Sequence, residues 1–325
     1  MSDLPEAVQV EAPARLHFGM LDLRGDLGRR FGGLGAALPA PRLRLRATRG
    51  DRLHASGLES ERVRAFAERF LTHHGLRGGA HLHVFEAMPA HAGLGSGTQL
   101  GLSVARALAE LNGLPTDPLA LAAAVGRGAR SGVGVWAFAY GGFVLEGGRR
   151  DIGAVAPLLA RHPMPEAWQC VLLIPQAGAG LSGENEAAAF RSLPQPPAHE
   201  VEHVAHLVLM QLLPAVVEAD LAAFGAALTE IQRVNGDWFA ASQGGRFAPG
   251  PTALLVALLR EAGAIGVGQS SWGPTVYAFA PDPKRAEGLA QAARGALQGA
   301  GEVIVTPFDN GGVRVTPMPH IGLAD

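Results

Sequence analysis

Cysteine and lysine are almost missing from this sequence. A single cysteine, Cys170, excludes an intrachain disulfide and a cluster of thiolate metal ligands. Lysine occurs only at Lys284, so the other 26 of the 27 Lys and Arg residues are arginines. A phosphate-binding loop that ends in Gly-Lys-Ser or Gly-Lys-Thr is therefore absent, and Schiff-base chemistry would depend on Lys284. Anionic groups must be held by arginine, backbone amides, histidine or metal.

Net charge and long hydrophobic runs are also scarce. The formal charge is -2 and the pI about 6.6, so no basic excess is present to hold a nucleic-acid backbone. The first 18 residues lack the basic and apolar regions of a signal peptide. Apolar stretches such as residues 204–213 contain His or Gln and fall short of the roughly 20 residues of a membrane span. We expect a cytoplasmic protein with no nucleic-acid partner and no membrane segment.

The length and the hydrophobic pattern predict two α+β domains. A chain of 325 residues exceeds the usual size of one domain, about 150 residues. Strands and helices occur in pairs rather than in strict alternation, which favours an α+β fold. A Pro-punctuated break at 157–165 places the boundary near residue 160, giving domains of 1–160 and 161–325. The periodicity predicts strands at 7–18, 41–55, 80–86, 168–175, 275–280, 302–306 and 312–316, and helices at 59–74, 98–111, 118–125, 199–218, 219–234, 251–262 and 283–299.

A glycine-rich segment, residues 88–99, joins a predicted strand to a predicted helix. Free N–H groups at the positive end of a helix dipole form an anion site, and glycines let the backbone approach a phosphate. Serine or threonine hydroxyls can add donors, and we expect one of them to cap the helix. The simpler alternative is a tight turn. The predicted phosphate-binding residues are Gly93, Leu94, Gly95, Ser96, Gly97, Thr98 and Arg127, the last set between two glycines.

The Pro-x-x-x-Gly-Leu-Gly-Ser pattern before a helix resembles the phosphate-binding motif of the GHMP superfamily of small-molecule kinases. Residues 12–15 and 266–273 resemble its other two motifs. The resemblance implies a two-domain, GHMP-kinase-like α+β fold. The chain departs from the kinases in having Gly97 in place of a metal-reaching Ser and Arg15 in place of a Lys, and it lacks an aspartate base after Ser131. An agent for removing a proton from a substrate hydroxyl is therefore not evident.

A set of segments follows in order along nearly the whole chain: 15–23, 28–29, 32–35, 126–128, 141–144, 213–215, 224–228, 243–245 and 268–275. In these segments the sequence is more similar to one non-kinase branch, the β-ribofuranosylaminobenzene 5′-phosphate synthase family. The resemblance implies condensation of 4-aminobenzoate with phosphoribosyl pyrophosphate, with release of CO2 and pyrophosphate, in methanopterin-type cofactor biosynthesis. It also implies Mg2+ dependence, no use of ATP, and a homodimer.

Several residues suit this chemistry. Because CO2 leaves where a proton otherwise would, the reaction asks for charge stabilisation and orientation more than for a strong base. His17 and Arg15 alternate on a predicted strand, so both can face one cleft. Asp22 can also simply cap a turn, and His17 can be a hydrogen-bonded core residue. The predicted catalytic residues are Asp22, Arg29, Arg15 and His17, the predicted metal ligands are Asp22 and then Asp309, and the predicted cleft residues are Gln269, Ser270 and Ser271.

Other interpretations stay open. An ATP-dependent GHMP kinase is the main alternative, and a ligand-binding relative without activity is another. His199-Glu-Val-Glu-His203 fits the His-Glu-x-x-His pattern of zinc proteases, and His81 with His83 shares one strand face. An aromatic substrate would call for a stacking partner, for which Phe18, Trp136 and Trp272 are candidates or else core residues.

Overall fold

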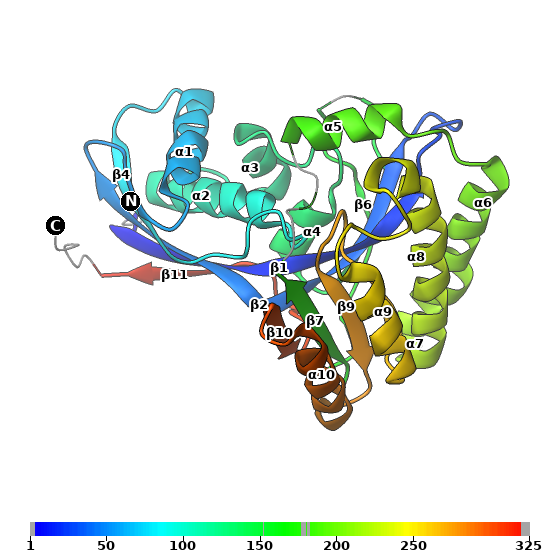
Figure 1. Cartoon of the computed structure of the whole chain (residues 1–325). Helices are drawn as coiled ribbons and strands as arrows, with labels where there is room; N and C mark the ends of the chain where they lie inside the picture. The colour runs from blue at the N-terminus through cyan, green and yellow to red at the C-terminus, as the bar shows by residue number, and fades with distance from the viewer. Residues whose placement is uncertain (1–3, 152, 177–179, 181–182, 320–325) are drawn as a thin grey trace.

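The computed structural model describes residues 4–151, 153–176, 180 and 183–319, which form two β-sheets covered by helices (Figure 1). The larger sheet is built on a long antiparallel hairpin of β1 and β2, in which Asp22 lies opposite Phe31 beside the turn. Its main path runs β11-β1-β2-β4-β3, and β5 pairs with the first part of β2 and with β6. The strands are β1 (Ala7–Asp22), β2 (Phe31–Gly50), β3 (His54–Gly57), β4 (Gly79–Glu86), β5 (Phe143–Glu146), β6 (Leu158–His162) and β11 (Arg314–Met318).

The smaller sheet is antiparallel, in the order β10-β7-β9-β8. Side chains of its central strand β7 are buried on both faces, because one face packs on helices α9 and α10 and the other joins the main core. The elements are β7 (Gln169–Pro175), β8 (Ile265–Gln269), β9 (Val276–Ala280), β10 (Gly301–Thr306), α9 (Thr252–Glu261) and α10 (Pro283–Leu297). Mixed strands and helices in two sheets confirm the predicted α+β class.

Four helices cover the larger sheet on one side, as Figure 1 shows: α1 (Ser60–His74), α2 (Ser96–Asn112), α3 (Pro118–Ala124) and α4 (Val133–Tyr140). The other helices are α5 (Gly183–Ser192), α6 (Ala198–Leu207), the π-helical turn η1 (Val208–Leu212), α7 (Leu213–Glu218) and α8 (Leu221–Gln243). The two sheets share one core around Phe18 of β1, whose ring contacts Phe143, Phe224, Tyr277 and Phe279. This core fixes α8 and β9 against β1, and so fixes the walls of the cleft described below.

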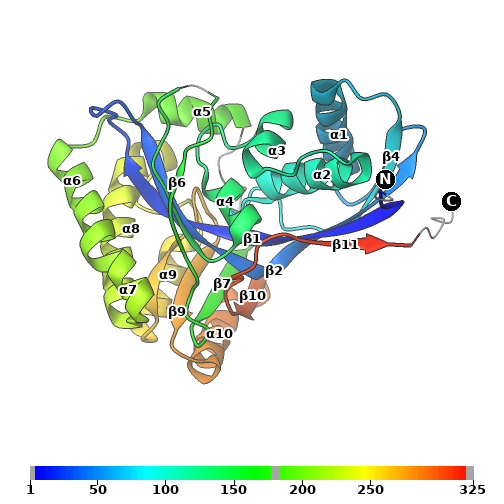
Figure 2. The same ribbon diagram turned by 180° about the vertical axis from the view of Figure 1, so that it is seen from behind.

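The predicted domain boundary near residue 160 falls within β6, which still belongs to the larger sheet. The chain then crosses to β7, and after β10 it returns to pair β11 with β1, as the reverse view in Figure 2 shows. Residues 314–318 therefore complete the sheet that residue 7 begins.

The helix from Ala198 to Glu218 is longer than the apolar run read from the sequence. In the described part of the chain it is the one helix long and apolar enough to cross a bilayer, by length and composition. However, Glu200 and His203 on it form hydrogen bonds to Trp238 and Glu230 of α8. A helix tied to its neighbour by polar side chains behaves as a flanking helix of the globular fold.

Candidate functional site

The predicted anion loop lies between β4 and the N-terminus of α2. Gly95 is the N-cap residue with φ 79°, and no side-chain hydrogen bond from a described residue caps the helix. The expectation that Ser96 or Thr98 caps α2 is therefore wrong. The N–H of Thr98 already donates to the Gly95 carbonyl (2.9 Å), so the donors that this uncapped end offers to an anion are the N–H groups of Ser96 and Gly97.

The other sheet supports this loop closely. A Cβ on Gly93, which has φ 83°, would lie 2.2 Å from the carbonyl oxygen of Ser270. The Ser270 hydroxyl donates to the Gly93 carbonyl (2.7 Å) and accepts from the N–H of His17 (3.0 Å). Ser270, predicted to line the cleft, is fully buried and instead joins the loop, β1 and the end of β8.

Arg15 lies beneath the loop. Its Nη1 donates to the Gly93 carbonyl (3.0 Å), and its backbone N–H donates to Leu94 (3.0 Å). Burial lowers the pKa of Arg15 to about 10, and the nearby charge of Glu186 opposes that shift. The guanidinium thus brings positive charge under the loop and holds its backbone in shape.

Four arginines gather at the helix end: Arg62 and Arg69 of α1, with Arg127 and Arg130 of the segment after α3. We call them the arginine cluster. A Cβ on Gly97 would lie 2.8 Å from Nη2 of Arg62 and 3.3 Å from Nη2 of Arg127, so glycine is what lets both guanidiniums approach. Burial, followed by the charges of Arg62, Arg69 and Arg130, lowers the pKa of Arg127 to about 10.

Two carboxylates of the described residues pair with this cluster. Glu59 pairs with Arg62 (2.7 Å), and Glu186 of α5 pairs with Arg130. Arg127 stacks on the Phe66 ring, 4.8 Å from its centroid, which aims its head toward the loop. Like charges that lower one another's affinity for protons also favour a bound anion. The cluster therefore extends the helix N-terminus into a site suited to phosphate or diphosphate.

His17 lies behind the loop in a buried chain of polar groups. Its Nε2 lies 3.1 Å from Oγ of Ser131, whose hydroxyl in turn hydrogen-bonds Glu146. Burial and the charge of Arg15 lower the pKa of His17 well below its usual value, so the imidazole is neutral. Burial raises the pKa of Glu146 to about 7, although N–H donors from Gly132 and Gly148 oppose the shift.

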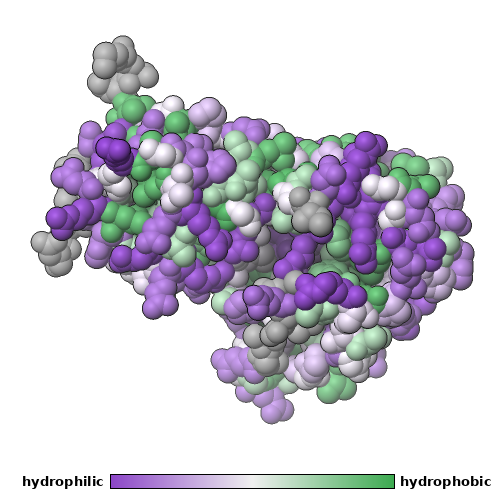
Figure 3. Space-filling model, turned by 90° about the horizontal axis from the view of Figure 1, so that it is seen from above, coloured by the Kyte–Doolittle hydropathy of each residue, from purple (hydrophilic) through white to green (hydrophobic). Residues whose placement is uncertain are grey.

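A pocket with about 450 Å³ of space, partly open to solvent, lies next to this chain. Figure 3 shows the surface hollowed near the middle of the face that carries α5. Phe190 of α5, Phe239 of α8 and Trp272 form one aromatic side of the pocket, and His17 and Gln269 also line it. We call it the aromatic pocket.

Hydrogen bonds to backbone fix the wall of the aromatic pocket. Asn235 of α8 accepts from the N–H of Met20 and donates to its carbonyl (3.1 Å). Gln269 accepts from Ala248 and donates to Ser271 (2.9 Å). Gln269 and Ser271 thus line the pocket as predicted, with their polar groups engaged in its construction.

Asp22 and Arg29 lie at the β1–β2 turn. Oδ1 of Asp22 accepts from the N–H groups of Arg24 (2.6 Å) and Gly25 (2.9 Å), which is the turn-capping arrangement. Arg29 donates to the Gly148 carbonyl (3.0 Å). The structure therefore gives both residues backbone partners at the turn, and their catalytic roles stay predictions.

Asp309 lies in a third place. It accepts from the N–H groups of Gly311 and Gly312 and forms an ion pair with Arg314 (3.0 Å). Its backbone N–H donates to the carbonyl of Ala37 in β2. Ala37 lies six residues along β2 from Phe31, and Phe31 is the residue that pairs with Asp22. Six strand residues span about 20 Å, so Asp22 and Asp309 cannot share one metal ion.

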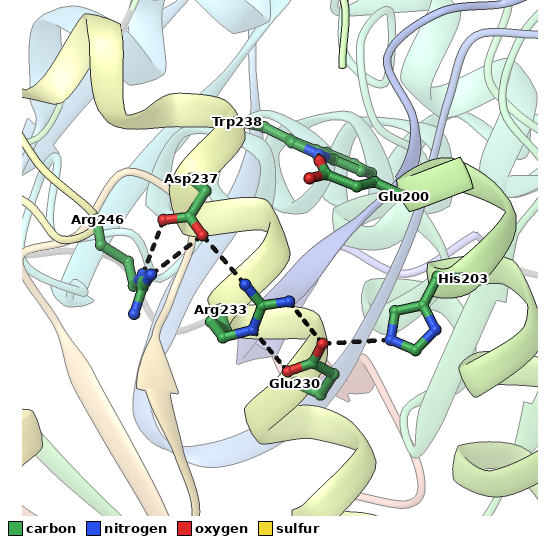
Figure 4. Close-up of polar contacts among 7 residues, drawn as sticks. All are labelled: Glu200, His203, Glu230, Arg233, Asp237, Trp238 and Arg246. Atoms are coloured by element: carbon green, nitrogen blue, oxygen red, sulfur yellow. Dashed lines mark hydrogen bonds and ion pairs between the residues drawn. The ribbon is translucent and has the colours of Figure 1, made fainter. Parts of the chain in front are cut away.

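The zinc-protease pattern forms no metal site in the described residues. Glu200 accepts from Nε1 of Trp238 (2.7 Å), and His203 contacts Glu230 (3.2 Å). Figure 4 shows that the polar contacts continue from Glu230 through Arg233 to Asp237. No group of three or more His, Cys, Asp or Glu positioned for a metal occurs in that part of the chain.

The other pattern candidates are also placed by the structure. His83 hydrogen-bonds Ser56 (2.8 Å) on the neighbouring strand. Phe18 is a core residue, and Trp136 is buried with its Nε1 donating to Ala156 (2.8 Å). Trp272 alone of the three aromatic candidates lines the aromatic pocket.

Comparison with known proteins identifies two domains and several relatives of this chain. Models of the GHMP kinase N-terminal and C-terminal domains match residues 61–142 and 212–298. The chain is 34% identical to β-ribofuranosylphenol 5′-phosphate synthase of Methanothermobacter thermautotrophicus, over 93% of this chain and 97% of the relative. It is 35% identical to the protein of that name from Archaeoglobus fulgidus, over 95% and 99%.

Solved structures show the same fold at low identity. Homoserine kinase from Cytophaga hutchinsonii has a TM-score of 0.72 at 17% identity, covering 97% of this chain and 99% of the kinase. L. major mevalonate kinase, solved with R-mevalonate, has a TM-score of 0.70 at 14% identity, covering 93% and 96%. At such identities these likenesses establish the fold alone.

Proposed function

The chain belongs to the family of β-ribofuranosylphenol 5′-phosphate synthases, built on the GHMP kinase fold, and from this we propose the reaction it catalyses. The proposed reaction condenses 4-aminobenzoate with 5-phosphoribosyl 1-pyrophosphate to β-ribofuranosylaminobenzene 5′-phosphate, with release of CO2 and pyrophosphate, in methanopterin-type cofactor biosynthesis. The relatives' names specify a phenol product, so 4-hydroxybenzoate is the competing acceptor to be tested.

The observation that carries the proposal is the arginine cluster at the uncapped end of α2. The donor has two anionic groups, and its diphosphate gains negative charge as the bond to ribose C1 breaks. Fixed donors at the place where charge grows stabilise the transition state more than the ground state. In the proposed mechanism Arg127 and Arg62, with the N–H groups at the start of α2, bind the diphosphate, and Arg15 adds charge from below.

The inner wall of the site suits a reaction that needs no strong base. His17 is neutral and buried, so it adds no positive charge that would repel the developing cation at ribose C1. Its hydrogen bond to Ser131 fixes the ring. In the mechanism we propose, His17 is a positioning residue between donor and acceptor, and CO2 leaves in place of a proton.

In the proposed mechanism Mg2+ binds to the protein together with the donor. Glu186, whose charge acts on Arg15 and Arg127, is already paired with Arg130, and Asp22 caps its own turn. The described residues therefore do not fit a metal site built by the protein. Mg2+ commonly binds substrate phosphates and keeps several waters, so it would arrive bound to the diphosphate.

The test is pyrophosphate release by the purified protein with Mg2+, phosphoribosyl pyrophosphate and either 4-aminobenzoate or 4-hydroxybenzoate. We expect release that requires the arene and is matched by CO2. Parallel reactions with ATP and small alcohols or acids test the kinase alternative, and ATP consumption without arene-dependent pyrophosphate would overturn the proposal. The proposed homodimer is tested by sedimentation, which measures the mass of the particle at assay concentrations.

A further inference from the structure

The aromatic pocket and the arginine cluster lie side by side. Glu186 and Phe190 are four residues apart on α5, so they occupy the same face of that helix about 6 Å apart. Glu186 pairs with Arg130 of the cluster, whereas Phe190 lines the pocket. His17 also lines the pocket, and the charge of Arg15 beneath the loop acts on it. A molecule in the pocket is therefore next to whatever the loop binds.

The aromatic walls of the pocket suit a flat ring. Trp272 contacts Phe239 with ring centroids 4.8 Å apart and Phe190 at 5.4 Å, both edge to face. Phe239 is half-buried, so part of its ring is available to a ligand. The pocket is partly open to solvent, so a ring can enter it from the surface.

The charges of the pocket suit a carboxylate that must leave. Arg246, the cation on its rim, is held by both oxygens of Asp237 at 2.9 and 3.1 Å, as Figure 4 shows. The amides of Asn235 and Gln269 are bonded to backbone. A cation clamped on the carboxylate would stabilise the substrate as much as the transition state and so would not help CO2 depart.

We propose that the aromatic pocket is the acceptor site, in which Phe190, Phe239 and Trp272 hold the ring of a 4-substituted benzoate next to the donor. This inference rests on the proposed function. The ring carbon that bears the carboxylate forms a bond to ribose C1, and the C1–O bond breaks with its electron pair going to pyrophosphate. The bond to the carboxylate then breaks, its electron pair restores the aromatic ring, and CO2 leaves.

The experiment compares Phe239→Ala and Phe239→Leu with a control, Phe85→Ala, which removes an exposed ring from β4. We expect Phe239→Ala to raise the KM for the arene at least tenfold and to leave the KM for phosphoribosyl pyrophosphate within twofold. Phe239→Leu preserves apolar volume without a ring face, so it should lie between wild type and Phe239→Ala. Thermal unfolding of each variant checks that the fold is intact.

Direct binding separates this inference from the proposed function. Calorimetry with 4-aminobenzoate or 4-hydroxybenzoate measures arene binding in the absence of turnover. Arene-dependent pyrophosphate release with an arene KM unchanged in Phe239→Ala would overturn the pocket assignment and leave the function standing. Arene binding that is lost in Phe239→Ala, in a protein without synthase activity, would support the pocket and overturn the function. If the protein shows no arene binding and no turnover, both the pocket assignment and the proposed function are overturned.

Discussion

Glu146 provides a prediction whose magnitude follows from the structure. Its carboxyl group is fully buried, and burial raises its pKa from 4.5 to about 7. The folded state therefore prefers the protonated group, and the stability it contributes is present below pH 4.5 and is lost as the pH rises through 7. Between pH 5 and pH 8 the wild type should lose roughly 2 to 3 kcal/mol relative to a variant that cannot titrate at this position.

The assay is denaturant unfolding of wild type and Glu146→Gln at pH 5, 6, 7 and 8. The new amide group loses one acceptor for the N–H groups of Gly132 and Gly148, which subtracts a similar amount at every pH. The informative quantity is therefore how the difference in unfolding free energy changes with pH. Glu287→Gln, at an exposed ion pair with Arg294, is the control. A Glu146→Gln difference that stays constant across this range would refute the reasoning.

Three further predictions concern the donor site and the β1–β2 turn. Arg127→Met should raise the KM for phosphoribosyl pyrophosphate about 10- to 100-fold in steady-state assays, since charge-assisted hydrogen bonds contribute roughly 1.5–3 kcal/mol. The control, Arg64→Met on the exposed face of α1, should change this KM less than twofold. Gly97→Ser should fold, because its Cβ meets only the flexible ends of Arg62 and Arg127. It should weaken donor binding several-fold in calorimetry by displacing those guanidiniums. Asp22→Ala should lower turnover more than substrate affinity if Asp22 acts on the reacting centre; unchanged turnover with a lower melting temperature would leave it as a turn cap.

The sequence predicted the elements that have a clear period or a clear boundary. The helix at 59–74 and the strand at 80–86 agree with α1 and β4 to within a residue. The first half of β2 was missed because residues 31–38 are buried on both faces and therefore do not alternate. Helix α4 was missed for a similar reason, since Val133–Tyr140 is apolar all round and its first six residues are buried.

The candidate site was predictable only where one segment builds it. The glycine-rich loop carries its own signal, because glycines between a strand and a helix point to an anion site. Arg62 gave no such signal: it lies on α1, and only the packing of α1 beside α2 brings it to Gly97. The aromatic pocket likewise joins α5, α8 and the turn after β8, three segments far apart in the sequence. Asp22 was predicted as a site residue because it lies in a segment that resembles the synthase family. The sequence could not show that its carboxylate accepts hydrogen bonds from the N–H groups of Arg24 and Gly25.

A gradient of polarity across the cleft links the two proposals. At one end the arginine cluster and the free N–H groups of α2 attract negative charge, and Gly97 is the residue that makes room for the guanidiniums. At the other end three aromatic rings form one side of a pocket whose rim cation is already paired with Asp237. In the proposed reaction electrons flow from the carboxylate through the ring and ribose C1 to pyrophosphate, so charge disappears at the apolar end and grows at the cationic end. Both bond cleavages are then favoured by the same fixed arrangement, without a base and without movement of charge on the protein.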